Sequence, residues 1–419
     1  YPVMQSSGNT IIFILFKTDA CEDFVLAVEI CEDLWTAMPP SVNHALAGAT
    51  IIANLSASNE VIAKDEYREM LVKSQSAKLY CGYIYSDAGY GESTTDLVFA
   101  GDNMIAENGT ILARSKRFNN ECVYTELDLE RLVGERKKSN TYNIVGSEKY
   151  VSVKLDMNIG DTKITRYVDK QPFVPSDDKK REKRSEEILS IQSLGLKKRL
   201  DHTHAKTAVV GVSGGLDSTL ALLVTVRAFD SLNLDRKNII AVTMPCFGTT
   251  DRTYNNAVNF ANSLGVTLKE VNIKAAVNQH FADIEHDPNV YDVTYENSQA
   301  RERTQILMDV ANKSGGLVIG TGDMSELALG WATYNGDHMS MYGVNAGVPK
   351  TLIRYLVDYE AKRTNNDILK KTLQDILDTP VSPELLPPKD GKISQKTEHI
   401  VGPYELHDFF LYYLMRFGS

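Results

Sequence analysis

The feature that most constrains the fold of this chain is a regular alternation of apolar strands and amphipathic helices from residue 185 onward. Short β-branched runs predict strands, and apolar residues at helical spacing predict helices between them. The expected strands cover 208–212, 239–243, 266–271 and 317–320, and the expected helices cover 186–200, 218–229, 254–264 and 296–313, with others beginning at 274 and near 324. Strand–helix–strand order of this kind favours an α/β fold with a doubly wound parallel sheet, whose ligands bind at the carboxyl ends of its strands.

The part of the chain before residue 130 mixes strands and helices less regularly. We expect strands at 24–30, 49–55 and 80–85, a helix at 65–79 and a meander over 97–113, in which Asn108 and Gly109 form a tight hairpin turn. Residues 131–176 lack long apolar runs, and we interpret them as a linker that carries a hairpin at 150–155. At about 150 residues per domain, the 419 residues suggest two or three domains, and we expect a domain at 1–130, the linker at 131–176 and a second domain at 177–419.

Composition and charge exclude several classes of function. The chain has 45 Lys and Arg against 55 Asp and Glu, a net charge of −10, which argues against nucleic-acid binding by broad phosphate neutralisation. The longest apolar run, 11–16, is far shorter than the roughly 18 residues that a membrane span requires. Five cysteines, an odd number, are atypical of a disulfide framework and favour the cytoplasm.

Both ends of the sequence are unusual for a complete protein. The chain opens at Tyr1 without a methionine, and it closes on a helical pattern and a stop at 411–419. We therefore expect the sequence to be part of a longer protein, truncated at both ends.

A glycine-rich loop between an expected strand and an expected helix predicts an anion site. The loop runs Ser213-Gly214-Gly215-Leu216-Asp217-Ser218. Glycines allow the backbone to approach a phosphate closely, and the following helix directs N–H groups and its positive dipole end at the same anion. The Asp217 carboxylate would repel a phosphate unless a divalent cation lies between them, which implies Mg2+. The Walker A and Rossmann glycine patterns do not occur here.

This loop resembles the pyrophosphate-binding loop of the N-type ATP pyrophosphatases, and further segments resemble one group of them, the bacterial glutamine-dependent NAD+ synthetases. These segments are 296–304, 320–333, 342–351, 382–385 and 395–404. The resemblance implies that the carboxylate of deamido-NAD+ is adenylated by ATP with release of pyrophosphate, and that ammonia then displaces AMP to give NAD+. It also implies a homo-oligomer.

The same resemblance implies roles for residues at the strand ends. It assigns ATP to Ser213, Gly214, Gly215, Asp217, Ser218, Met244, Thr321 and Lys350, and deamido-NAD+ to Asn297, Arg301 and Glu326. Asp217 and Glu326 are carboxylates suited to hold Mg2+. Lys350 and Arg301 supply positive charge to the transferring phosphoryl group.

A cysteine at the end of the expected strand 24–30 predicts a nucleophile. Cys31, with Glu32 and Asp33 after it, resembles the corresponding segment of nitrilase-type glutaminase domains, where the cysteine attacks the glutamine amide. Cys21 has the same two acids after it but precedes the strand, so the role is assigned to Cys31. By this resemblance the first domain is part of a nitrilase-like αββα sandwich. Glutamine would be held by Glu32, Ser58 and Lys64, the last replacing a family arginine and keeping charge without a two-pronged contact.

Two groups of that glutaminase are expected to be missing. In nitrilase folds the general-base Glu and the oxyanion-stabilising Lys precede the cysteine, but the thirty residues before Cys31 contain one lysine, Lys17, outside the family context. Glu22 and Glu29 are unsuitable, since one follows Cys21 and the other lies within the expected strand.

Three alternatives stay open. The chain could use ammonia alone, or it could use another acceptor in the manner of a GMP synthetase-like ligase, which the Cys31 segment disfavours. It could also be a non-catalytic nucleotide sensor, against which the paired carboxylates Asp217 and Glu326 argue.

Overall fold

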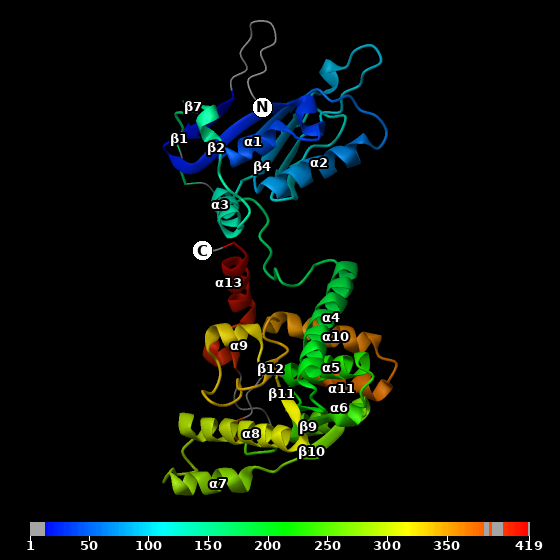
Figure 1. Ribbon diagram of the computed structural model, residues 1–419, viewed down its shortest axis with the longest axis vertical. Coiled ribbons are helices and arrows are strands. Elements are labelled where there is room, and N and C mark those ends of the chain that lie inside the picture. Colours follow the sequence, from blue (N-terminus) through cyan, green and yellow to red (C-terminus); the bar gives the residue numbers. More distant parts are fainter. Residues whose placement is uncertain (1–12, 159, 162, 381–384, 388–396, 418–419) are drawn as a thin grey trace. The chain divides into compact units, whose positions relative to one another are not determined.

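The computed structural model describes residues 13–158, 160–161, 163–380, 385–387 and 397–417. The chain divides into two compact units, Tyr1–Val168 with Arg416–Ser419, and Asp169–Met415. The division therefore falls inside the segment 131–176 that the sequence suggested as a linker. Figure 1 shows the elements of each unit.

The first unit is built on one mixed sheet of seven strands in the order β6-β5-β4-β3-β2-β1-β7. Its strands are β1 (Ile14–Thr18), β2 (Cys21–Ile30), β3 (Ile51–Ser56), β4 (Gly82–Asp87), β5 (Met104–Glu107), β6 (Thr110–Arg114) and β7 (Val151–Lys154). Its helices are η1 (Cys31–Trp35), α1 (Pro40–Leu46), α2 (Lys64–Leu79), η2 (Tyr90–Glu92), α3 (Leu129–Lys138) and η3 (Ser147–Lys149). The central strands β2, β3 and β4 are parallel, and β1, β5 and β6 add to them as antiparallel neighbours.

The core of this unit forms where α2 and α1 cover the central strands. Val72 of α2 packs with Ile52, Tyr83 and Met104 of the sheet, and all four side chains are fully buried. Burial of side chains of this size supplies about 1.5–3 kcal/mol each, so the central strands are the stable part of the unit.

Two sequence expectations for this unit have different outcomes. The hairpin turn at Asn108 and Gly109 is confirmed, because both residues have positive φ (44° and 82°) between the paired strands β5 and β6. The hairpin expected at 150–155 is wrong. Those residues form the single strand β7, which pairs parallel with β1, 137 residues earlier by the partners Ile14 and Val151. A pairing so distant in sequence leaves no local signal.

The second unit contains a five-stranded sheet in the order β10-β9-β8-β11-β12, and every pair in it is parallel. The strands are β8 (Thr207–Gly211), β9 (Ile239–Thr243), β10 (Thr267–Glu270), β11 (Gly316–Gly320) and β12 (Tyr342–Gly343). The chain builds outward from β8 in one direction and then returns to place β11 on its other side. This switch in strand order opens a crevice at the carboxyl ends of β8 and β11.

The second unit contains eleven described helices, some of which cover the two faces of its sheet. They are α4 (Asp178–Thr203), α5 (Leu216–Ser231), η4 (Arg236–Asn238), α6 (Asp251–Leu264), α7 (Lys274–Asp283), α8 (Val293–Ser314), α9 (Met324–Leu329), α10 (Lys350–Arg363), α11 (Asp367–Leu377), α12 (Glu398–Val401) and α13 (Tyr404–Phe417). Alternate residues of β8 enter different clusters: Ala208 and Val210 pack with α4, α5, α6, α10 and α11, whereas Val209 packs with α7 and α8. The expected doubly wound parallel sheet is confirmed.

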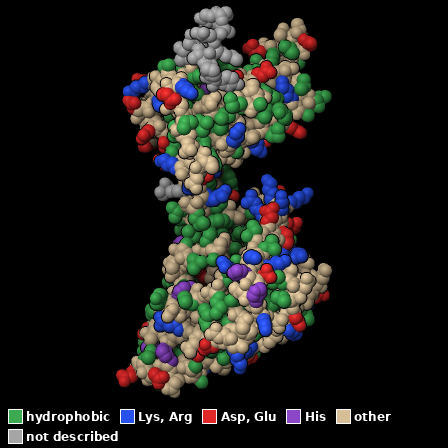
Figure 2. Space-filling view, viewed as in Figure 1, with side chains coloured by type: hydrophobic (Ala, Val, Ile, Leu, Met, Phe, Trp, Pro, Cys, Tyr) green, Lys and Arg blue, Asp and Glu red, His purple; other side chains and the backbone are tan. Residues whose placement is uncertain are grey.

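Charged and hydrophobic side chains gather at different places on the surface of the second unit (Figure 2). Figure 2 shows Lys and Arg side chains gathered at the start of α4, next to acidic ones, and hydrophobic side chains along α13. The apolar side chains of α13 with more than half of their surface exposed are Leu406, Phe410, Leu414 and Met415. Within the described ranges, no helix combines the length and apolar character needed to cross a membrane.

Candidate functional site

The loop between β8 and α5 has a conformation that requires glycine at one position. Gly214 has a φ of +83°, and a Cβ atom there would lie 2.2 Å from the carbonyl oxygen of Thr253. Ser213 Oγ accepts a hydrogen bond from the Gly215 N–H at 3.2 Å, and Ser218 Oγ donates to the Gly215 carbonyl at 3.1 Å. The loop is thereby held tight at the start of a 16-residue helix, where backbone N–H groups and the dipole favour an anion.

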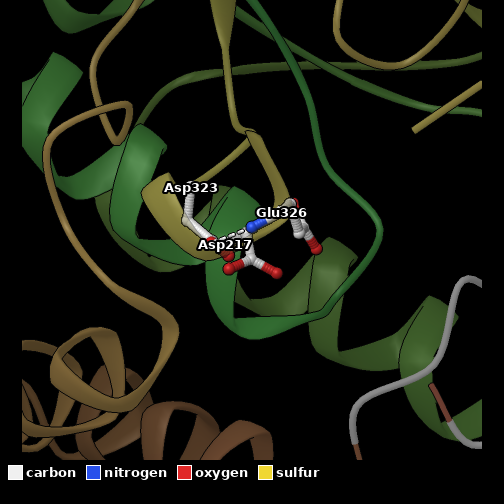
Figure 3. Close-up of side chains that lie close together, drawn as sticks. All are labelled: Asp217, Asp323 and Glu326. Atoms are coloured by element: carbon white, nitrogen blue, oxygen red, sulfur yellow. Dashed lines mark hydrogen bonds between the residues drawn. The ribbon is translucent and has the colours of Figure 1, made fainter. Parts of the chain in front are cut away.

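Three carboxylates from two helices meet beside this loop. Asp217 belongs to the first turn of α5, Asp323 precedes α9 as its N-cap, and Glu326 lies in the first turn of α9. One oxygen of each lies within 4.8 Å of the others. Figure 3 shows the three side chains pointing toward one another, with the Glu326 N–H donating to Asp323.

A buried lysine joins the three carboxylates. Lys350, the first residue of α10, places its Nζ 2.8 Å from Asp217 Oδ2, 2.6 Å from Asp323 Oδ2 and 2.8 Å from Glu326 Oε1. Its side chain is 4% exposed. With every group ionised, the cluster carries two more negative charges than positive ones.

Burial and mutual repulsion shift the protonation of this cluster. Burial raises the pKa of Asp323 to about 6 and that of Glu326 to about 8; the negative charge of Asp217 adds to both shifts and Lys350 opposes them. Burial by itself would lower the pKa of Lys350, but the three carboxylates outweigh it and raise that pKa. Carboxyl groups that are costly to ionise together favour an added cation.

The cluster fits a divalent cation such as Mg2+. Oδ1 of Asp217 is buried and, among the described residues, accepts no hydrogen bond. Carboxylate oxygens are the ligands that Mg2+ prefers, usually one or two together with phosphate oxygens and water. Asp217 and Glu326 would hold such an ion next to the anion loop, with Asp323 as a third acidic neighbour.

Asn345 fixes the two sides of the crevice to each other. Its fully buried side chain donates from Nδ2 to the carbonyl oxygens of Asp217, at 2.9 Å, and of Thr321, at 3.0 Å. Its Oδ1 accepts a hydrogen bond from Gln192 at 3.2 Å. The start of α5 and the segment that follows β11 are thereby joined at the switch point.

A cavity of about 240 Å3 opens above the cluster. Of the residues assigned from the sequence, the lining contains Ser213, Asp217, Ser218, Met244, Thr321 and Glu326. Gly214 and Gly215 shape the loop behind the cavity. Lys350 does not line the cavity itself but contacts Asp217 and Glu326, which do. Thr397 also lines it, whereas 382–384 and 395–396 of the segments that carried the resemblance lie outside the described residues.

The helix α8 turns a different face to the cavity from the one expected. Arg301 is exposed and donates from Nε to the Tyr334 carbonyl at 3.1 Å, and Asn297 accepts a hydrogen bond from Thr333 at 2.8 Å. The residues of α8 that line the cavity are Ala300, Arg303, Thr304 and Leu307. These follow the helical spacing i, i+3, i+4 and i+7, so they share one face.

Sequence reasoning missed Asp323, Arg303 and Asn345. Asp323 had a readable signal, because Asp-x-x-Glu is the pattern of a helix N-cap. Arg303 lies two residues after Arg301, and the rotation of α8 about its axis decides which of the two faces the cavity. Asn345 lies in the segment 342–351, but nothing local indicates that its amide joins the start of α5 to the segment after β11.

In the first unit, Cys31 occupies a strained backbone position. It follows β2 directly, has a φ of +47° and is half-buried. Two hydrogen bonds hold the turn: Asn54 Nδ2 donates to the Cys31 carbonyl at 3.3 Å, and Asp33 Oδ2 accepts from the Ile30 N–H at 2.8 Å. Left-handed non-glycine residues of this kind cluster at functional sites. Cys21 begins the same ten-residue strand and lies at its other end.

Glu29 supports this turn from within the sheet. Its buried carboxylate accepts hydrogen bonds from the Tyr83 hydroxyl and from the Ser41 N–H, the latter at 2.7 Å. Asn54 Nδ2 lies 3.5 Å from the same carboxylate and so connects it to Cys31. Burial raises the pKa of Tyr83, and the adjacent Glu29 charge adds to the shift. Glu29 is therefore engaged in the sheet core.

The residues proposed to hold glutamine are placed differently from one another. Glu32 is exposed, whereas Ser58 is buried and donates its N–H to Asp87 Oδ1 at 2.9 Å. Lys64 donates to the Asn59 carbonyl at 2.8 Å, and its Nζ lies 5.3 Å from the centre of the Trp35 ring. Since Trp35 ends the short helix that Cys31 begins, Lys64 lies over the helix that carries the cysteine.

Comparison with known proteins extends these observations. The family described as NAD synthase matches residues 188–413. A glutamine-dependent NAD(+) synthetase of Mycobacterium tuberculosis (strain ATCC 25618 / H37Rv) is 43% identical over 421 residues, which cover 97% of this chain and 62% of the relative. A protein of the same name from Aquifex aeolicus is 29% identical over 392 residues, 91% of this chain and 64% of its own length.

A solved glutamine-dependent NAD+ synthetase of Acinetobacter baumannii, in complex with ADP, matches with a TM-score of 0.43 and 22% identity. That match covers 86% of this chain and 60% of the solved one. The chain thus spans about three fifths of the length of the curated relatives named above.

Proposed function

The chain belongs to the NAD synthase family, and on that premise we propose that it amidates deamido-NAD+ to NAD+ in a reaction that uses ATP, Mg2+ and ammonia from glutamine. The observation that carries the proposal is the cluster of Asp217, Asp323 and Glu326 around Lys350. It adjoins an anion loop without a Walker lysine, and that loop resembles the pyrophosphate-binding loop of the N-type ATP pyrophosphatases, which cleave ATP between its α and β phosphates. The Mycobacterium and Aquifex relatives carry the same activity in their names.

In the first step, a carboxylate oxygen of the nicotinate group attacks the α-phosphorus of ATP. The bond from that phosphorus to the bridging oxygen of the β-phosphate breaks, and pyrophosphate leaves with the electron pair. The loop 213–218 holds the departing phosphates with its N–H groups and hydroxyls. Mg2+, bound by Asp217 and Glu326, would neutralise charge on those oxygens. The Lys350 ammonium pairs with all three carboxylates and so keeps Asp217 and Glu326 close enough together to bind one ion.

In the second step, ammonia attacks the activated carbonyl carbon and the bond to the AMP oxygen breaks. The product amide is NAD+, and the nitrogen loses one proton to solvent. Water would hydrolyse the adenylate in the same way, so the cavity must exclude it. Ala300 and Leu307 of α8 supply apolar lining for that purpose.

We propose that the first unit supplies the ammonia. The Cys31 thiolate would attack the carboxamide carbon of glutamine and release ammonia, and water would then hydrolyse the thioester to glutamate. The strained φ of Cys31 and its support by Asn54 and Asp33 favour this role. We also propose a cytoplasmic homo-oligomer. The five cysteines, all of them among the described residues and all unpaired, agree with a reducing compartment.

A two-arm assay tests the proposal. The chain is incubated with deamido-NAD+, ATP and Mg2+ and with either ammonium or glutamine, and NAD+ is measured. We expect ammonium to support faster turnover than glutamine, because Glu29, the buried acid beside Cys31, is held by Tyr83 and Ser41. Turnover with ammonium alone would favour the ammonia-dependent variant of the same chemistry. No NAD+ in either arm would refute the proposal.

A further inference from the structure

The helix α10 begins without a cap of its own. Its N-cap residue is Pro349, which offers no side chain to accept hydrogen bonds from the first turn. The first N–H groups of a helix have no partner inside it, so a buried helix start needs acceptors from elsewhere. This start is buried, because Lys350 and Leu352 are both less than a tenth exposed.

Two side chains from other helices supply those acceptors. Ser325 Oγ of α9 accepts the Lys350 N–H at 2.9 Å. Asp408 Oδ2 of α13 accepts the Thr351 N–H at 2.9 Å and the Thr351 hydroxyl at 2.6 Å. The cap of α10 is thus provided by a residue 57 positions further along the chain.

Asp408 also orients Ser325, the other of these acceptors. Its Oδ1 accepts a hydrogen bond from the Ser325 hydroxyl, which leaves a lone pair of Ser325 Oγ for the Lys350 N–H. The carboxylate is 2% exposed and the serine is fully buried. One buried carboxylate therefore fixes the backbone on both sides of the peptide that joins Lys350 to Thr351, through hydrogen bonds of the strong, charge-assisted kind.

The same helix face contacts the lysine side chain. Tyr404 and Asp408 are four residues apart, lie on one face of α13 and are the residues that this helix buries. The Tyr404 ring centre lies 5.4 Å from Lys350 Nζ. Contact with the face of an aromatic ring stabilises an ammonium ion. The helix α13 therefore holds Lys350 at its backbone and at its ammonium group.

We propose that Asp408 is a positioning residue for Lys350, and that α13 thereby belongs to the adenylation site. Asp408 does not touch the cavity; it acts through Ser325 and the start of α10. The proposal rests on the proposed function, because Lys350 matters only if the carboxylate cluster carries out the chemistry.

The test compares two helix-cap losses in the same unit. Asp408→Ala removes the cap of α10, and Asp408→Asn keeps the shape but turns one acceptor into a donor that faces Thr351 or Ser325. The matched control is Asn366→Ala, because Asn366 caps α11 by accepting from the Ile368 and Leu369 N–H groups, at 3.0 and 3.1 Å. The control removes two backbone hydrogen bonds, against the one that Asp408 accepts from the Thr351 N–H, and it does so at a helix start that does not line the cavity.

We expect both Asp408 variants to lower kcat of the ammonium-driven reaction about 10- to 100-fold, as a small misplacement of a catalytic group does. KM for ATP should stay within about threefold, because the loop 213–218 makes no contact with Asp408 that would be lost. Asn366→Ala should lower the melting temperature by a few degrees, as the Asp408 variants should. It should leave kcat within about twofold of the unsubstituted chain. A second readout is free of activity: Lys350 should react faster with an amine-directed acylating reagent in the Asp408 variants, measured by peptide mass spectrometry.

Each outcome decides the matter. If kcat falls no more in Asp408→Asn than in Asn366→Ala, or if Lys350 acylation is unchanged, Asp408 is a structural cap only and the inference is wrong while the proposed function stands. If the unsubstituted chain forms no NAD+, the proposed function and this inference fail together. If Asp408→Ala does not fold, the shape-preserving Asp408→Asn variant carries the comparison.

Discussion

Gly214 is the residue at which local geometry most directly determines the chemistry of the anion loop. With a φ of +83°, and with the Thr253 carbonyl 2.2 Å from the place of a Cβ atom, the loop admits no other residue without moving α6. Gly265 is a matched comparison, since it has a φ of +75° but nothing lies within 4 Å of its Cβ position.

We predict that Gly214→Ala lowers ATP affinity at least about tenfold, because the loop must leave the position that presents its N–H groups. Gly265→Ala should destabilise the unit by about 1 kcal/mol through backbone strain alone and leave ATP affinity unchanged. Calorimetric titration of each variant with ATP and Mg2+ makes the comparison. Equal affinities in the two variants would show that Gly214 is not needed at the loop.

The residues of the anion loop that line the cavity could be predicted from the sequence, whereas those of α8 on the other side of the cavity could not. The loop residues Ser213, Asp217 and Ser218 line the cavity because a strand, a turn and a helix follow each other without interruption. The choice between Arg301 and Arg303 depends on how α8 rotates against the sheet, and that rotation is set by packing with α7 and β8. Asp323 could have been predicted as the N-cap of α9 from the pair Asp-x-x-Glu at the start of that helix.

At the scale of elements, α1 is fixed by a contact that no local pattern could indicate. His44 of α1 is 2% exposed and its Nδ1 lies 2.8 Å from the hydroxyl of Tyr150, which precedes β7. The two residues are 106 positions apart. Phe13 packs edge-on against the His44 ring as well. The expectation of a separate hairpin at 150–155 was wrong for this reason: β7 pairs with β1 of the sheet, and Tyr150 contacts His44 of α1.

The burial of His44 makes the first unit sensitive to acid. Burial lowers the pKa of His44 to about 4 from an ordinary value of 6.5, against weaker opposing influences of a backbone hydrogen bond with Val28 and of the Asp33 charge. Between these two values the unfolded chain binds a proton that the folded chain does not, so stability falls as pH falls. The term amounts to about 2 kcal/mol at pH 5 relative to pH 7.

We therefore predict that His44→Gln flattens the pH dependence of unfolding between pH 7 and pH 5. Urea unfolding of the first unit at both pH values, followed in the variant and the unsubstituted chain, measures the difference. Asp87 acts in the opposite sense, because burial raises its pKa to about 6, but it is present in both proteins and cancels. Parallel pH profiles would contradict the assigned burial of a neutral His44.

Most of the elements of the second unit were predictable, because each strand and each helix of an α/β alternation shows its own hydrophobic pattern within a short segment. The strand at 239–243 and the start of the helix at 274 agree with β9 and α7 to the residue. What the sequence did not indicate is how α13 returns to α10, since the contacts of Asp408 with Ser325 and Thr351 join three helices across distances of 57 to 83 positions.

At the scale of the whole molecule, the two proposed chemistries lie in separate compact units. The carboxylate cluster, the anion loop and Asp408 all belong to the unit Asp169–Met415, and Cys31 with its supports belongs to the other. With a net charge of −10, the proposed function draws positive charge for the nucleotide from local sources: Lys350, Arg303, the α5 dipole and the proposed Mg2+. Adenylation can therefore be tested separately from the supply of ammonia.

The nucleotide products of a single turnover distinguish the proposed adenylation of deamido-NAD+ from every other use of ATP. The chain is mixed with labelled ATP, Mg2+ and deamido-NAD+, first without and then with ammonium. We expect pyrophosphate and an adenylate to form only when deamido-NAD+ is present, and ammonium to convert the adenylate to NAD+ and AMP in equal amounts. Asp217→Asn should abolish both steps, whereas Asp375→Asn, which releases Arg252 instead, should not. Formation of ADP and phosphate, or of AMP at the same rate without deamido-NAD+, would contradict the account.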